Sequence, residues 1–258
     1  MFRYNVECMG TGFLFQIQEE DNQQVLKELC NSALEVLQDA DEKFSLYKQN
    51  SELKQLLRKD LSWEKASAQQ RLVLEEVERW NLVTSGYFDA KPNTPGYDPS
   101  GYVKTWATMN AANYLLANGV RKFTINAGGD IYLSQELDSP LLNRVGLSNL
   151  RSISDKNAGS NLVIDLAGTS FRGVATSGVS ERGEHIWRKD ERKSFVQVSV
   201  VGPDLLEADI WATAIISGGF PAWEAFMNST TGKLVAIGFA QDGSVFGSPG
   251  FSAVLGTV

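Results

Sequence analysis

A carboxylate and a hydroxyl lie one helical turn apart in the last quarter of the chain. Asp209 and Thr213 stand at positions i and i+4 of an apolar segment that we expect to form a helix from about Leu205 to Ser217. Residues at this spacing share one helix face, so their oxygens point the same way. Oxygen ligands of this kind suit a hard cation such as Mg²⁺. A structural Asp–Thr pair near a helix start would explain the same residues.

A second candidate is a helix start in the middle of the chain. Asp98 is placed to act as an N-cap carboxylate, with Pro99 at the first helical position. The free N–H groups and positive dipole end of such a terminus suit a phosphate. Lys104 follows within the second turn, and Phe88-Asp89 precede the segment. An N-capped helix with a solvated lysine would look the same.

Two glycine-containing segments follow predicted strands. Met9 to Gly12 separates two strands, and Asn126 to Asp130 comes directly after another, with paired glycines at Gly128-Gly129. Glycine lets the backbone approach a ligand closely, although a tight turn explains both segments. No G-x-G-x-x-G fingerprint and no GK[ST] motif is present, which excludes Rossmann and P-loop nucleotide sites.

Polar side chains gather just past the end of the first predicted helix. Phe44 to Tyr47 and Ser51 to Leu53 place Ser, Tyr and Ser beyond an apolar helix end. By itself such a segment is more often a loop than a binding site.

The chain has a single histidine, His185. It follows Ala175 to Gly178 and the pair Glu181-Arg182. One histidine and two cysteines exclude a His-rich zinc site. An isolated histidine is more often structural than catalytic, so His185 alone does not identify a reaction.

Charge and composition exclude further classes of function. A net charge of −7 leaves no basic footprint for nucleic acid. Cys8 and Cys30 are too few for a disulfide framework, and both fall on apolar patterns that predict buried thiols. No run of roughly 18 apolar residues occurs, so we expect no membrane insertion. The N-terminus has no apolar signal segment or cleavage site, and we expect a cytoplasmic protein, or one trimmed at this end.

Helices are expected mainly in the first half of the chain. An amphipathic helix spans Asp21 to Phe44, a capping box of Ser67 and Gln70 opens another that runs to about Thr84, and a third runs from Asp98 to Leu116, with Gly119 at C′. The apolar positions of the first helix are Val25, Leu29, Ala33, Val36, Leu37 and Ala40.

Strands are expected at the start and through the second half. The second half adds the helix from about Leu205 to Ser217 and a short one from Ala222 to Met227. Segregated helices and strands favour an α+β fold with helices packed on mixed or antiparallel sheets. The predicted strands are Phe2–Val6, Phe13–Gln18, Phe123–Asn126, Ile131–Leu133, Arg144–Leu147, Leu162–Asp165, Gly173–Thr176, Phe195–Val201 and Leu234–Ala240.

In series, these segments resemble the ApbE family, the FAD:protein FMN transferases. The resemblance covers nearly the whole chain in the right order, and its specificity comes from the series, because no single segment is diagnostic. The segments that carry it are Met9-Gly10-Thr11, Phe44 to Tyr47 with Ser51 to Leu53, Phe88-Asp89, Asp98 to Ala107, Asn126 to Asp130, Ala175 to Gly178 with Glu181-Arg182 and His185, and Ala208-Asp209 with Thr213.

The resemblance implies a fold and a site. It implies one α+β domain over residues 1–258, with a T-fold-like part and two intertwined lobes that bind FAD between them. Asp209 and Thr213 match side-chain ligands of Mg²⁺, and Gly101 matches a ligand that acts through its backbone carbonyl. The positions that match the flavin nucleotide site are Met9, Tyr47, Phe88, Asp89, Asp98, Lys104 and His185.

The resemblance also implies a reaction. Members cut the FAD pyrophosphate and pass FMN to a Ser or Thr hydroxyl of an acceptor flavoprotein, releasing AMP, and some hydrolyse FAD to FMN and AMP. His185 is then the natural candidate to take the acceptor proton, because an imidazole titrates near neutral pH.

Three departures from the family pattern leave alternatives open. Thr105 stands where Gly is usual and Asn110 where Asp is usual, and the stretch after His185 is shorter and lacks the usual Asp-Pro. These changes bear on the acceptor groove more than on FAD binding. An FAD pyrophosphatase, a non-catalytic FAD-binding protein and a globular protein unrelated to flavin are the alternatives.

Overall fold

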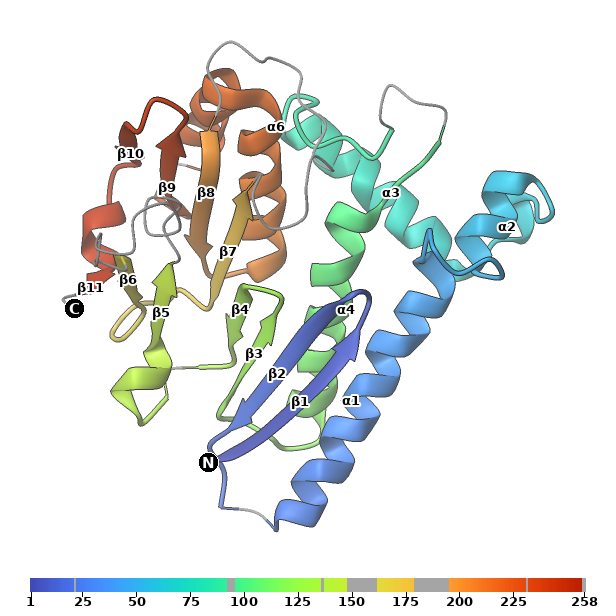
Figure 1. Ribbon diagram of the computed structural model, residues 1–258, viewed down its shortest axis with the longest axis horizontal. Coiled ribbons are helices and arrows are strands. Elements are labelled where there is room, and N and C mark those ends of the chain that lie inside the picture. Colours follow the sequence, from blue (N-terminus) through green and yellow to red (C-terminus); the bar gives the residue numbers. More distant parts are fainter. Residues whose placement is uncertain are drawn as a thin grey trace. The chain divides into compact units, whose positions relative to one another are not determined.

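Most of the helices lie in the first half of the chain and most of the strands in the second, as expected, in the computed structural model (Figure 1). The structure describes residues 1–20, 22–91, 96–135, 137–147, 162–178, 195–230 and 232–256. Two compact units follow one another along the chain, Met1–Gly128 and Gly129–Val258. Helices packed on antiparallel sheets confirm the α+β prediction. The description as one domain of two intertwined lobes stays a prediction.

The first unit combines a small antiparallel sheet with several helices. Strand β2 lies between β1 and β3, and helices α1 and α4 lie side by side (Figure 1). Alternate residues of β2, namely Phe13, Phe15 and Ile17, are buried, which is the pattern of a strand with one face in the core. The elements are β1 (Phe2–Cys8), β2 (Thr11–Ile17), α1 (Gln23–Phe44), α2 (Glu52–Arg58), a 3₁₀ turn (Trp63–Lys65), α3 (Ala68–Val83), α4 (Ser100–Ala117) and β3 (Phe123–Ala127).

The buried face of α1 differs at its start from the predicted one. Val25 is 45% exposed, and Leu26 takes the core position instead. The periodicity alone allowed either residue, since the two differ by only about 100° around a helix. The buried positions are Leu26, Cys30, Ala33, Leu37, Ala40 and Phe44. Cys8 and Cys30 are both free and buried, as predicted.

The helix ends follow the sequence signals, except that the Gln70 side chain forms a different hydrogen bond from the predicted one. Ser67 Oγ accepts from the N–H of Gln70 at 3.2 Å, which confirms the N-cap of α3. The Gln70 side chain does not complete the capping box: its amide donates to the carbonyl of Lys43 at 2.8 Å, so it ties α3 to the last turn of α1. This bond satisfies one of the last carbonyls of α1, which have no partner within the helix.

Helix α4 begins one residue later than predicted. Pro99 is the N-cap and Ser100 the first helical residue, and Asp98 Oδ1 accepts from the Ser100 N–H at 2.9 Å. The end of α4 is as predicted: Gly119 has φ +91°, and its N–H donates to the carbonyl of Leu116. The N–H of Val120 donates to the carbonyl of Leu115, which completes a Schellman motif.

The second unit is built from two antiparallel sheets and one long, interrupted helix. One sheet has the order β4-β7-β8-β9-β10 and the other β11-β6-β5, and α6 packs on β7 and β8. The elements are β4 (Asp130–Leu133), a 3₁₀ turn (Pro140–Asn143), β5 (Arg144–Leu147), β6 (Leu162–Asp165), β7 (Gly173–Gly178), β8 (Phe195–Gly202), α6 (Leu205–Ser229), β9 (Val235–Ala240), β10 (Val245–Gly247), a 3₁₀ turn (Phe251–Val254) and β11 (Leu255–Gly256).

Helix α6 contains the break that the sequence predicts between two helices. Gly219 has φ +61° and ψ −141°, values outside the helical region, and Pro221 follows it. Glycine reaches this conformation without steric cost, and proline supplies no N–H to the preceding turn. Asp204 caps the helix, since its Oδ1 accepts from the N–H groups of Leu206 at 2.7 Å and Glu207 at 3.3 Å.

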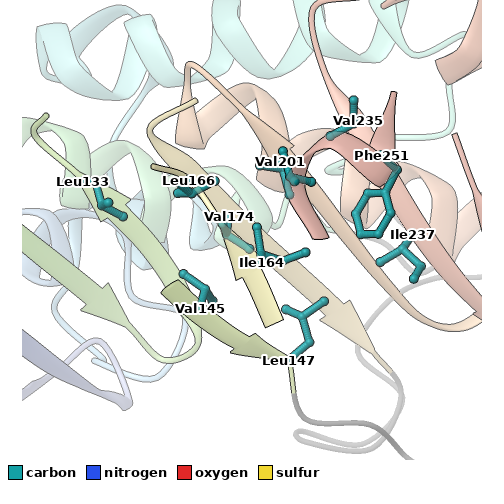
Figure 2. Close-up of a cluster of buried hydrophobic side chains, with 11 residues drawn as sticks. Leu133, Val145, Leu147, Ile164, Leu166, Val174, Val201, Val235, Ile237 and Phe251 are labelled. Carbon is teal, nitrogen blue, oxygen red and sulfur yellow. The ribbon is translucent and has the colours of Figure 1, made fainter. Parts of the chain in front are cut away.

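The core of the second unit lies between its two sheets. Figure 2 shows Val174 and Val201 of one sheet among the same side chains as Val145 and Ile164 of the other. Branched apolar residues on facing strands interdigitate in this way when two sheets pack face to face. The other face of β7 and β8 is covered by α6, so these strands are buried on both sides.

Candidate functional site

Tyr47 stands on a short connection that is held by hydrogen bonds at both ends. Ser45 Oγ accepts from the N–H groups of Tyr47 and Lys48, both at 3.2 Å, and Ser51 Oγ donates to the Ser45 carbonyl at 2.6 Å. Ser51 also caps α2. The serines of this segment therefore have structural roles, while the Tyr47 side chain is 94% exposed. An aromatic ring presented to solvent on a fixed loop suits contact with another ring.

Met9 occupies the turn of the β1–β2 hairpin in an unusual conformation. Met9 has φ +52° and Gly10 has φ +71°, which is the pattern of a two-residue type I′ turn. Asn or Gly is the usual residue at the first position, and a methionine held there is strained by about 1 kcal/mol or more. Strain of this kind at an exposed turn is the observation that favours a functional role for the Met9 side chain.

The hairpin end lies beside the segment that carries Tyr47. Burial raises the pKa of the Cys8 thiol, and the nearby Asp41 carboxylate raises it further, while the Met9 backbone and Lys48 lower it. Lys48 in turn forms an ion pair with Asp41 at 2.6 Å, and the pKa of Lys48 is raised mainly by that bond. The charges that act on Cys8 thus come from the end of α1 and from the residue next to Tyr47.

Two open hollows adjoin one another on the hairpin. Their volumes are about 530 and 570 Å³, and both are bordered by Glu7 and Gly12. Among the described residues that line them, none is a predicted nucleotide ligand. The first is lined by Asn5, Val6, Glu7, Gly12, Phe13, Leu14 and Asn126, and the second by Glu7, Cys8, Gly10, Thr11 and Gly12.

Phe88 and Asp89 have different environments although they are adjacent. Phe88 is 3% exposed, its N–H donates to Thr84 Oγ1 at 2.9 Å and its carbonyl accepts from the Asn81 side chain at 2.8 Å. Phe88 is therefore an anchor of the segment. Asp89 is exposed, and its Oδ1 accepts from the N–H of Lys91 at 2.8 Å.

The start of α4 presents the other predicted residues of the first unit. The N–H of Asp98 donates to the carbonyl of Ala90 at 2.8 Å, which ties this helix start to the segment after Asp89. Gly101 is exposed on the first turn, and Lys104 is half-buried on the second. Thr105, where the family usually has Gly, is 1% exposed, so its side chain lies in the interior rather than on the ligand-facing surface.

Asp209 and Thr213 lie in the second unit, on the second and third turns of α6. Asp209 carries a charge but is only 5% exposed. It is the only charged residue between Glu207 and Glu224 in the sequence. A buried carboxylate loses hydration, and a cation or hydrogen bonds must offset that loss. Its neighbours Ile210, Trp211 and Ala212 are fully buried.

The donor set fits Mg²⁺ better than a softer metal. Within the described residues no three His, Cys, Asp or Glu side chains form a cluster, so the described ligands offered by the sequence are one carboxylate and one hydroxyl. Mg²⁺ characteristically takes one or two carboxylates, keeps several waters and binds substrate phosphates. A buried carboxylate with a hydroxyl one turn away is consistent with that habit.

Two buried residues on neighbouring strands, one of which contacts Thr213, are not predicted individually from the sequence. Ser177 Oγ lies 3.2 Å from Thr213 Oγ1, and Asp130 Oδ1 accepts from the N–H of Thr176 at 3.0 Å. Asp130 is 1% exposed and Ser177 is 8% exposed. From the sequence they stand out only as members of the candidate segments Asn126 to Asp130 and Ala175 to Gly178, because their partners are distant in the sequence.

The described candidates thus fall into two groups. In the first unit, the segment from Phe88 to Asp89 adjoins the start of α4 with Asp98, and the hairpin end with Met9 adjoins the segment of Tyr47. In the second unit, Thr213 contacts Ser177 and shares a helix face with Asp209. His185, Glu181 and Arg182 lie outside the described residues. None of the described helices is long and apolar enough to cross a membrane.

Comparison with known proteins gives one family and a set of similar folds. A model described as the ApbE family matches residues 90–237, more than half of the chain. The flavin transferase ApbE from Vibrio cholerae is 18% identical, with 98% of each chain covered and a TM-score of 0.78. The ApbE protein from Thermotoga maritima is 15% identical, with 99% of each chain covered and a TM-score of 0.75.

A third solved structure agrees with these two. The flavinyl transferase ApbE from Pseudomonas stutzeri is 14% identical, with 98% of this chain and 97% of that chain covered and a TM-score of 0.76. A search of curated proteins gives no match. At such identities the solved structures establish the fold over almost the full length.

Proposed function

The chain belongs to the ApbE family, and from this premise we propose that it uses Mg²⁺ to transfer the FMN half of FAD to a Ser or Thr hydroxyl of an acceptor flavoprotein, releasing AMP. The observation that carries the proposal is the buried Asp209 with Thr213 one turn away, within the residues that match the family. The names of the similar structures, a flavin transferase and a flavinyl transferase, support the same reaction.

The reaction is a phosphoryl transfer with a simple balance of bonds. The acceptor oxygen attacks the phosphorus of the FMN half, and the bond from that phosphorus to the bridging oxygen breaks. AMP leaves with the bridging oxygen, and the acceptor proton passes to a base. Such a transfer needs positioning and charge neutralisation more than covalent participation by the protein.

The metal ligands proposed for this chain are Asp209 and Thr213, with the Gly101 carbonyl as the third ligand that the family pattern implies. When bound, Mg²⁺ would neutralise charge that develops on the pyrophosphate and on the departing AMP. The burial of Asp209 supports the assignment, because a fixed carboxylate of low mobility holds a small cation in a defined place.

Residues of the first unit are proposed to hold the nucleotide. The free N–H groups at the start of α4 and the charge of Lys104 suit a phosphate. The exposed Tyr47 ring and the Met9 side chain suit an aromatic ring system, with Asp89 and Asp98 as hydrogen-bond acceptors and Phe88 as their anchor. His185 is proposed as the base that takes the acceptor proton.

The direct test is mass spectrometry of an acceptor domain after incubation with this protein, FAD and Mg²⁺. The proposal expects a mass gain equal to one FMN on the acceptor, formed together with AMP. EDTA should abolish both products, and excess Mg²⁺ should restore them. An acceptor domain whose Ser or Thr is replaced by Ala is the matched control and should gain no mass.

Other outcomes identify the alternatives. AMP that appears at the same rate with and without acceptor, and without a mass gain, would identify an FAD pyrophosphatase. A protein that binds FAD and is yellow, but releases no AMP with any acceptor, would be a flavin-binding protein. Either result would overturn the transfer step.

A further inference from the structure

Ser177 contacts Thr213, one of the proposed metal ligands. The two hydroxyl oxygens are 3.2 Å apart, and either can be the donor. Ser177 lies on β7 and is 8% exposed, while Thr213 lies on α6, which packs on that strand. The contact is therefore a part-buried hydrogen bond that joins a strand to the proposed metal-binding helix.

We propose that Ser177 is a positioning residue: its Oγ accepts a hydrogen bond from the Thr213 hydroxyl and so directs a lone pair of Thr213 Oγ1 toward the metal. This inference rests on the proposed function, because it assumes a cation at Asp209 and Thr213. A threonine hydroxyl has one proton and two lone pairs. A cation bound at Oγ1 repels the proton, which then needs an acceptor on the side away from the metal.

The surroundings of Ser177 make it a fixed acceptor. The preceding residue is held on both sides of β7: the Thr176 N–H donates to the buried Asp130, and Thr176 Oγ1 lies 2.8 Å from Ser199 Oγ. Successive side chains of a strand point to opposite faces, so Ser177 faces α6 when Thr176 faces away. A strand held in this way presents the Ser177 oxygen in one place.

A close approach of strand and helix begins at the start of β7. Gly173 leaves no room for a side chain, since a Cβ there would lie 2.6 Å from Leu205 Cα. Small residues at a contact of this kind let two backbones come close. The short distance between β7 and the start of α6 brings a side chain as short as serine within reach of Thr213.

A purely structural role is the competing explanation. A hydroxyl–hydroxyl bond within a protein typically stabilises the fold by about 1 kcal/mol, whether or not a metal binds nearby. The two explanations differ in one respect: the positioning role requires Thr213 to be a metal ligand. Residues in the outer shell of a metal site typically change metal affinity by about 10–100-fold.

The test is Mn²⁺ binding to the full chain, followed by the electron paramagnetic resonance signal of free Mn²⁺. Mn²⁺ serves as the probe because it accepts the same oxygen ligands as Mg²⁺. Ser177→Ala is expected to weaken binding by about 10-fold. Ser177→Cys, close in size but a weak acceptor, should do the same if the alanine variant does not fold. Ser177→Thr keeps the hydroxyl and should restore most of the affinity.

Ser199→Ala is the matched control. It removes a hydroxyl pair of similar length on the opposite face of the same sheet, and Mn²⁺ affinity should stay at the wild-type value. Equal losses in Ser199→Ala and Ser177→Ala would show that Mn²⁺ affinity follows the packing of the sheet, and would overturn the positioning role.

A double-mutant cycle separates positioning from packing. In a Thr213→Val background the ligand hydroxyl is gone, so Ser177→Ala should cause no further loss of Mn²⁺ affinity. The same additional loss in both backgrounds would overturn the inference.

Asp209→Ala distinguishes this inference from the proposed function. If Asp209→Ala abolishes Mn²⁺ binding and Ser177→Ala leaves it unchanged, the metal site stands and the positioning role is wrong. If Asp209→Ala has no effect, the metal assignment and the positioning role both fail, while the mass gain of the acceptor still reports on FMN transfer.

Discussion

The two units of this protein present their candidate residues in opposite ways. In the first unit the candidates lie on loops and helix starts: Tyr47 is 94% exposed, Asp89 and Gly101 are exposed as well, and only the anchor Phe88 is buried. In the second unit they lie deeper: Asp209 is 5% exposed, Ser177 is 8% exposed and Thr213 is half-buried. The first set is available to a ligand, whereas the second set is fixed by the fold.

This difference matches two demands of the proposed reaction. A nucleotide is large, and exposed rings and helix N–H groups can bind it without being part of the core. A metal ion needs its ligands within a few tenths of an ångström, which buried side chains on packed elements provide. Substitutions should therefore separate ligand affinity from stability in the first unit and couple activity to packing in the second.

The largest effect is expected from Asp209→Ala. Loss of the buried carboxylate should lower Mg²⁺-dependent FMN transfer by more than about 100-fold, since even outer-shell changes reach that range. FAD binding, measured by quenching of flavin fluorescence, should persist in part. Glu207→Ala on the same helix is the control and should keep most of the activity. Full transfer by the Asp209 variant would remove this residue from the metal site.

A packing change in the second unit should come next. Gly173→Ala places a Cβ 2.6 Å from the backbone of Leu205, so the start of α6 must shift. We expect a loss of about 1–3 kcal/mol in the free energy of unfolding, together with lower transfer activity. Urea denaturation measures the first quantity. Gly146→Ala is the control, because nothing lies within 4 Å of its Cβ position. Equal stabilities of the two variants would contradict the tight contact.

A smaller effect, on affinity alone, is expected in the first unit. Tyr47→Ala should raise the Kd for FAD by roughly 10-fold, because stacking on an aromatic side chain contributes about 1–3 kcal/mol. The melting temperature without ligand should not change, since the ring is 94% exposed. Leu82→Ala, also exposed at 80%, is the control for loss of apolar surface and should bind FAD normally. A Tyr47 variant with normal affinity for FAD would contradict the role of exposed first-unit residues in binding the nucleotide.

The smallest effect concerns the interior of the first unit and its response to pH. Burial raises the pKa of the Cys30 thiol from 9.0 to about 12. The folded state therefore holds this proton more tightly than the unfolded state. The resulting stability is fully present below pH 9 and is lost as the pH rises toward 12, with a slope of at most about 1.4 kcal/mol per pH unit.

Cys30→Ala should flatten this part of the stability profile. Burial also raises the pKa of Tyr97 and Tyr132, so the informative quantity is the difference between wild type and variant. Urea denaturation at pH 8 and at pH 10.5 measures this difference in unfolding free energy. The two pH values lie below and above the ordinary thiol pKa, by about one to two units. Parallel profiles would show that Cys30 does not titrate differently in the folded protein.

Local sequence signals predicted most elements well. The bounds of β5 and β6 agree with the prediction, and so do the Ser67 cap and the Gly119 helix end. These features depend on neighbouring residues and on backbone conformations that few residue types adopt. Helix α2 was not predicted, because a helix of 7 residues is too short to show periodicity. The first core position of α1 was also wrong, since adjacent apolar residues compete for it.

By itself, the sequence determined most of the element types, the negative net charge and the candidate residues that follow from motif order. Only the tertiary structure decided which of them are buried and what they contact. Ser177 and Thr213 are 36 residues apart, and Asp130 and Thr176 are 46 apart. Such pairs form because sheet register and the packing of α6 bring distant segments together, and no local pattern encodes that approach. The exposure of Tyr47 and the burial of Asp209 have the same origin.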